Sequence, residues 1–168
     1  FGQASRNARA SSIALACGQY PIAQAIAERW LQFAPGDTAA LLALAQAELG
    51  RYQVADARRH FKSLIDTAGN NVTETLDALV QRVGTEPTLV MLRELESPRL
   101  KSPDAQLALA ALALDAWDAN LALRYAQSAR TAGASAAAAG AISARAQAVL
   151  GNASAAGAAA KQAAHSGR

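Results

Sequence analysis

Residues 18–37, GQYPIAQAIAERWLQFAPGD, decide the fold. The stretch opens with Gly18 at one turn-like break and closes with Pro35, Gly36 and Asp37 at a second. We therefore predict a helix over residues 21–33, with a turn on each side. The apolar residues of this stretch recur at intervals of four, which places them on one face of that helix: Ile22, Ala23, Ile26, Ala27, Trp30 and Leu31.

The first of these breaks recurs along the chain at a nearly constant interval. It falls at Gly18, Gly50, Gly84, Trp117 and Gly151, with spacings of 32, 34, 33 and 34 residues. Two interleaved series of one period predict a repeated unit of two helices, with one turn inside the unit and one at its end. The second series lies between the members of the first, at residues 35–37, 69–71, 102–104 and 133–135.

The composition favours helices throughout. Alanine, which has the highest helix propensity, supplies 46 of the 168 residues, whereas aromatic residues make up 5%. We place Asp37 and Asp104 at helix N-caps and Thr85 just before the first turn of its helix. The pattern predicts ten helices in five pairs: 3–17 with 21–33, 38–49 with 53–67, 71–83 with 87–96, 104–115 with 119–131, and 135–149 with 153–164.

Such short linkers make neighbouring helices antiparallel, and because one pair cannot bury both of its faces, the pairs stack. We therefore predict an all-α fold, a right-handed α-solenoid of about five antiparallel helix-turn-helix pairs. The chain starts at Phe1 without a methionine and stops in mid-pattern, so we expect a fragment of a longer repeat array. The predicted single superhelical domain consists of units at about 3–35, 36–69, 70–102, 103–135 and 136–168.

A helix-turn-helix unit of about 34 residues resembles the tetratricopeptide repeat. In that family small residues occupy positions 8 and 20 of the unit, and glycine often stands at position 15. Taking the five breaks as position 15, the third unit departs from this rule because it has Asp77 and Leu89 where small residues belong. Position 8 is filled by Ser11, Ala43, Asp77, Ala110 and Ala144, and position 20 by Ala23, Ala55, Leu89, Ala122 and Ala156.

The resemblance implies that the first helix of each pair lines a concave groove, and that a protein or peptide partner binds there. The implied lining mixes leucines with isolated charges of both signs. The alternative for these residues is that the leucines pack against the next unit and the charges are solvated. The groove residues implied are Arg9, Leu41, Leu44, Glu48, Glu74, Gln81, Arg82, Leu107, Asp115 and Arg145.

The residues do not form a catalytic or metal-binding constellation. The two histidines, His60 and His165, are about three units apart, so no His-based metal site or triad is assembled from them. HExxH, P-loop, GxSxG and CxxC motifs do not occur in the sequence. We therefore predict that the chain is not an enzyme and uses no cofactor and no metal.

Charge and hydropathy bear on two further classes of partner. The formal net charge is +3, and the densest basic cluster is Arg58, Arg59, His60 and Lys62. One such cluster without interleaved aromatics favours a solvated helix face over a nucleic-acid site. No apolar run approaches the ~18 residues that span a bilayer. We predict no nucleic-acid partner and no direct membrane insertion of this fragment.

These observations favour a protein-interaction scaffold or adaptor that holds a partner protein or peptide in its groove. The Ala- and Arg-rich texture is similar to that of large tetratricopeptide lipoproteins and scaffolds of Gram-negative bacteria. That similarity implies a role in envelope assembly or protease docking, in the periplasm or at the outer membrane more than in the cytoplasm. The alternatives are a structural segment of a longer superhelix that mediates self-association, and a regulatory solenoid with a small ligand in the groove.

Overall fold

The structure is a computed structural model, which describes residues 2–69 and 71–166. Asn70, in one predicted break, and the last two residues of the fifth predicted unit lie outside the described residues. The described residues form ten α-helices and one short 3-10 helix, η1. Their bounds are α1 Gly2–Ala16, α2 Tyr20–Phe33, α3 Thr38–Gly50, α4 Val54–Thr67, α5 Val72–Val83, α6 Thr85–Arg93, η1 Pro98–Lys101, α7 Pro103–Asp115, α8 Ala119–Thr131, α9 Ala136–Val149 and α10 Ala153–Ser166.

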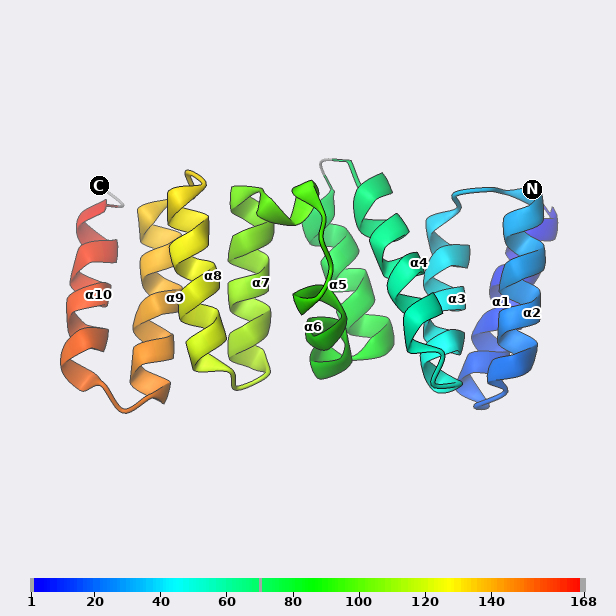
Figure 1. Ribbon diagram of the computed structural model, residues 1–168, viewed down its shortest axis with the longest axis horizontal. Helices are drawn as coiled ribbons and strands as arrows, with labels where there is room; N and C mark the ends of the chain where they lie inside the picture. Colours follow the sequence, from blue (N-terminus) through cyan, green and yellow to red (C-terminus); the bar gives the residue numbers. More distant parts are fainter. Residues whose placement is uncertain (1, 70, 167–168) are drawn as a thin grey trace.

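The helices stand side by side in one row, and the two ends of the chain lie at opposite ends of the row (Figure 1). The most extensive packing is between successive helices from α1 to α4 and from α7 to α10, whereas α5 and α6 contact their neighbours less. Odd-numbered helices also contact one another in succession, α1 with α3, α3 with α5, α5 with α7 and α7 with α9. The odd-numbered helices therefore form one continuous layer, and the predicted all-α solenoid of helical hairpins is confirmed.

Small side chains allow the helices to approach closely. Ala23 and Ala27 of α2 and Ala122 and Ala126 of α8 are fully buried, and a helix that presents alanine to its neighbour lets the two backbones come close. The bulky part of the core lies between α3 and α9, and Phe61 is its largest fully buried side chain. A smaller cluster, made mostly of alanine, joins α1, α2 and α3.

The ends of the helices confirm one predicted cap and correct two. Asp37 caps α3, because its Oδ1 accepts hydrogen bonds from the backbone N–H groups of Ala39 at 2.9 Å and Ala40 at 3.0 Å. Asp104 is not a cap. Ser102 caps α7 because Pro103 occupies the first helical position, which needs no N–H partner. Thr85 is already the first residue of α6.

The turns inside four of the hairpins have the same backbone conformation. The residue with positive φ in each is Gly18, Tyr52, Trp117 or Gly151. In each turn this residue and the next donate backbone hydrogen bonds to the last turn of the preceding helix, the arrangement of a left-handed helix C-terminus. The break of the second unit is therefore at Tyr52, and its prediction at Gly50 is wrong by two residues.

Glycine at position 50 is required by packing and not by a left-handed backbone conformation. It is the last residue of α3, and a Cβ added to it would lie 2.4 Å from Cδ1 of Tyr20. The missing side chain therefore makes room for the Tyr20 ring at the start of α2. With Tyr52 as position 15, the small residue at position 20 becomes Ala57, which is buried, in place of Ala55, which is exposed.

The third hairpin differs from the others. Gly84 alone separates α5 from α6, whereas three residues separate the helices of each other hairpin. The second helix of this pair, predicted over 87–96, is therefore wrong at both ends: α6 covers Thr85–Arg93 and is followed by an irregular segment and η1. In α5 Leu76 is buried, one place before the predicted Asp77, which is exposed, whereas in α6 Thr88 and the predicted Leu89 are both buried.

Candidate functional site

All ten implied groove residues lie on the odd-numbered helices. Six of them are exposed and are available to a partner: Arg9, Glu74, Gln81, Arg82, Asp115 and Arg145. Leu107 is half-buried, and Leu41, Leu44 and Glu48 are buried.

The three buried residues all belong to α3, where the sequence register is two residues off. Leu41 packs in the main core and Leu44 in the smaller alanine-rich cluster, so their side chains do not face solvent and the packing alternative describes them. Moving the break from Gly50 to Tyr52 moves these three groove positions to Ala43, which is buried, and to Gln46 and Gly50. Gln46 and Gly50 are half-buried.

A hollow of about 410 Å³ lies between α3 and α5 and is closed by the end of α4. Leu42, Leu64 and Leu79 give it apolar walls, and Glu74 is the one charged residue among those that line it. Threonine and asparagine side chains at the helix ends complete its rim. The hollow thus combines an apolar wall with a single carboxylate, the usual character of a small recognition pocket.

A second hollow, of about 730 Å³, lies where the irregular segment returns to α4 and α5. Asp66, Gly69 and Arg99, which line it, are engaged in hydrogen bonds. The Ser97 hydroxyl donates to Oδ1 of Asp66 at 2.7 Å, and the Arg99 guanidinium donates to the carbonyl of Gly69 at 2.9 Å. Hydrogen bonds from Lys62 and then from Ser97 hold the pKa of Asp66 below its usual value. These contacts fasten the segment after α6 to the end of α4.

The basic cluster at residues 58–62 is paired with acids. Arg59 pairs with Asp56 and Lys62 with Asp66, both within α4. Two further pairs join α4 to other segments, Arg58 with Glu94 just after α6 and His60 with Glu48 of α3. The cluster therefore has its own counter-ions, as a solvated helix face does, and does not present a free basic patch.

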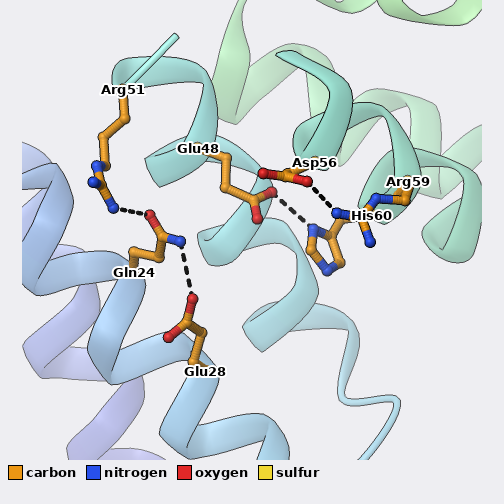
Figure 2. A network of polar contacts seen from close by, with 7 residues as sticks. All are labelled: Gln24, Glu28, Glu48, Arg51, Asp56, Arg59 and His60. Carbon is orange, nitrogen blue, oxygen red and sulfur yellow. Dashed lines mark hydrogen bonds and ion pairs between the residues drawn. The ribbon is translucent and has the colours of Figure 1, made fainter. Parts of the chain in front are cut away.

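The Glu48–His60 pair is the most deeply buried of these contacts (Figure 2). Glu48 is 3% exposed, and its Oε2 lies 2.7 Å from Nδ1 of His60. The hydrogen bond to Glu48 raises the pKa of His60 against the opposing effect of burial. Nearby, Arg51 donates to Oε1 of Gln24 at 2.5 Å and so joins the α3–α4 turn to α2 (Figure 2). The first contact ties the two helices of the second hairpin together, and the second joins that hairpin to the first.

We expect the stability of the protein to fall as the pH rises through the raised pKa of His60. The folded state binds this proton more tightly than the unfolded state, so the stabilisation is fully present below the unfolded pKa of about 6.5 and is lost above the folded one. Urea denaturation at a series of pH values measures this. Replacing His60 by glutamine should remove this component, and an unchanged pH dependence in that variant would contradict the assignment.

Within residues 2–69 and 71–166, no three or more His, Cys, Asp or Glu side chains are grouped in a way that suits a metal ion. Across the same residues, each helix is too short or too polar to cross a bilayer.

Comparison with known proteins places the fold. No family model matches the chain, and no curated protein matches it. Among solved structures, the crystal structure of MamA protein is 14% identical and superposes with a TM-score of 0.50, over 99% of this chain and 93% of that one. TTC0263, a thermophilic TPR protein of Thermus thermophilus, is 20% identical with a TM-score of 0.47, over 97% and 91% of the two chains. With its stacked antiparallel hairpins, the chain therefore has the fold of the tetratricopeptide-like repeat proteins.

Proposed function

We propose that the chain is a protein-interaction module that binds a segment of a partner protein along the layer of odd-numbered helices. The observation that carries this proposal is the hollow between α3 and α5, with its leucine walls and the carboxylate of Glu74. The exposed charges on the same layer support it, because they alternate in sign along the row: Arg9 on α1, Glu74 and Arg82 on α5, Asp115 on α7 and Arg145 on α9.

Apolar and charged contacts within the hollow would contribute to such binding in different ways. Apolar side chains of the partner would displace water from the half-buried Leu42 and cover Leu64 and Leu79, which are already buried, and each Å² of apolar surface removed from water favours association by about 25 cal/mol. The carboxylate of Glu74 would accept a hydrogen bond from a cationic or amide group of the partner and so fix its orientation. Charges farther along the layer would select the register of the bound segment and reject like-charged competitors.

The experiment is an unbiased selection of peptides on the purified chain, followed by affinity measurements on charge-reversal variants. We expect Glu74→Lys to weaken binding of the selected peptides about tenfold or more, because a like charge then opposes the partner. The matched control is Asp77→Lys. Asp77 is exposed on the same helix but does not line the hollow, so its reversal should leave the affinity unchanged. Equal losses in both variants, or no selected peptide, would overturn the proposal.

A second candidate is a structural segment that stacks on further copies or further repeats, and α10 favours it. This terminal helix has no buried residue in its described part, and alanines fill much of its uncovered surface, as they do in the interior contacts of the other helices. Sedimentation velocity over a dilution series separates this candidate from the groove-binding one. A monomer at all concentrations argues against it, whereas association that is lost on replacing Ala160 by glutamate supports it.

We further propose that the module acts in the bacterial envelope, where it would hold assembly proteins or a protease. The support for this location is the Ala- and Arg-rich composition. Cell fractionation of a tagged full-length protein tests the compartment, and recovery in the cytoplasm alone would exclude this location while leaving groove binding untouched.

A further inference from the structure

Large hydrophobic side chains are exposed mainly along one edge of the row, where the two helices of each hairpin join (the lower edge in Figure 1). We name this the turn edge. In the described part of the chain, the two exceptions are Phe33, at the end of α2, and Val90, inside α6. The others lie in the hairpin turns or within one helical turn of them: Ile13, Ile22, Tyr52, Val54, Trp117, Val149 and Leu150.

Tyr52 and Trp117 are the most exposed of these side chains, at 90% and 81%. Both have φ of 61°, a conformation that disfavours side chains. The equivalent position in the first and fifth hairpins is glycine, at Gly18 and Gly151, which adopts this conformation freely. Because the two rings bury almost nothing within the chain and stand where the backbone favours glycine, folding does not account for them. Both rings are available for contacts outside the chain.

We propose that the turn edge lies against the surface of a lipid bilayer, with the rings of Trp117 and Tyr52 in the headgroup region. These exposed apolar groups lie in or beside four separate hairpin turns, and the hairpin turns are spread along one edge of the row (Figure 1). An extended fluid surface can contact all these turns at once without matching their shape. Tryptophan and tyrosine prefer this environment because each has an apolar body and one polar group.

The charges at the turn edge indicate which kind of lipid surface fits. Two basic and three acidic residues stand in or beside the turns: Arg51, Arg82, Glu86, Asp115 and Asp118. Arg51 is bound to Gln24, and Asp118 accepts a hydrogen bond from the backbone N–H of Leu121 at 2.9 Å. The edge thus lacks the basic excess that attracts acidic lipids. Its contact is peripheral and apolar, and it suits a neutral headgroup such as phosphatidylcholine.

Tryptophan fluorescence in the presence of phosphatidylcholine vesicles tests the proposal. The chain has two tryptophans, and Trp30 is buried at 4% exposure, so a change on adding vesicles reports Trp117. We expect the emission to shift to shorter wavelength and to be quenched by brominated lipid. The same shift is expected with and without added phosphatidylglycerol, and at low and high salt.

Matched variants separate binding from folding. In the double variant Tyr52→Gly with Trp117→Gly, co-sedimentation with vesicles should fall about tenfold or more, since two large aromatic surfaces are removed. The helices should remain intact in circular dichroism, because glycine already fills the equivalent position of two other hairpins. Phe33→Ala removes an exposed aromatic side chain from the opposite edge and should leave co-sedimentation unchanged.

Three results would overturn the proposal. The first is a wild-type chain that neither shifts its emission nor sediments with vesicles. The second is binding that requires phosphatidylglycerol and vanishes at high salt, which is electrostatic adsorption. The third is an equal loss of binding in Phe33→Ala, which indicates general adhesion of exposed aromatics. Because the turn edge is separate from the hollow beside Glu74, peptide affinity should be the same in the double glycine variant and the wild type.

Discussion

Replacing Phe61 by alanine lowers the free energy of unfolding by about 3–5 kcal/mol. Phe61 is 0% exposed, and it packs from α4 into the cluster of leucines that joins the second hairpin to the third and fourth. The substitution removes the largest fully buried side chain of the described residues and leaves a cavity that rigid neighbouring helices fill only in part. Urea denaturation followed by circular dichroism measures the loss.

Phe33→Ala is the matched control for this prediction. The same ring is removed from the end of α2, where it is 63% exposed, and the stability should change by less than about 0.5 kcal/mol. Similar losses in the two variants would mean that the core does not lie where the structure places it.

The second prediction concerns the register of the second hairpin. Replacing Ala57 by leucine should cost about 1–3 kcal/mol, because Ala57 is fully buried and three added heavy atoms have no room there. Replacing Ala55 by leucine should leave the stability within about 0.5 kcal/mol, because Ala55 is exposed and the two residues have similar helix propensities. The measurement is the midpoint of thermal or urea unfolding. A larger cost at Ala55 would restore the register that starts from Gly50.

The repeat period alone predicts most of this fold. Glycine, proline and capping residues recur at a spacing that fits two helices per unit, and the apolar periodicity between them fixes the helical faces. Asp37 illustrates why this works: its cap is local, and the side chain and its two N–H partners lie within three residues. Local rules of this kind are visible in the sequence.

The two register errors arise because the sequence alone does not show whether a glycine is required by its backbone conformation or by a close packing contact. Gly50 is required by the ring of Tyr20, a contact made 30 residues away in the sequence. The left-handed turn is instead taken by Tyr52, a residue type that is rare in this conformation. At Gly84 the turn is shortened to one residue, and in α5 Leu76 is buried in place of the predicted Asp77.

The candidate site is predicted less completely than the fold. The repeat frame predicts six residues of the odd-numbered layer that are exposed. It also predicts Glu48 in the groove and misses its burial, because its partner His60 lies on another helix. The pairs within α4 can be predicted from their spacing of three or four residues. Pairs between helices depend on how the helices are rotated, and a shift of two residues in α3 is enough to hide them. Hollows between helices depend on the same rotation.

The central claim is that five hairpins stand in an open row whose ends do not meet. Small-angle X-ray scattering over a dilution series tests it most directly. A compact globule of 168 residues has a radius of gyration of about 15 Å. The open row predicts a clearly larger value at infinite dilution and a pair-distance distribution with a long tail. A radius near 15 Å with a symmetric distribution would mean that the first and last hairpins pack together, and would contradict the account.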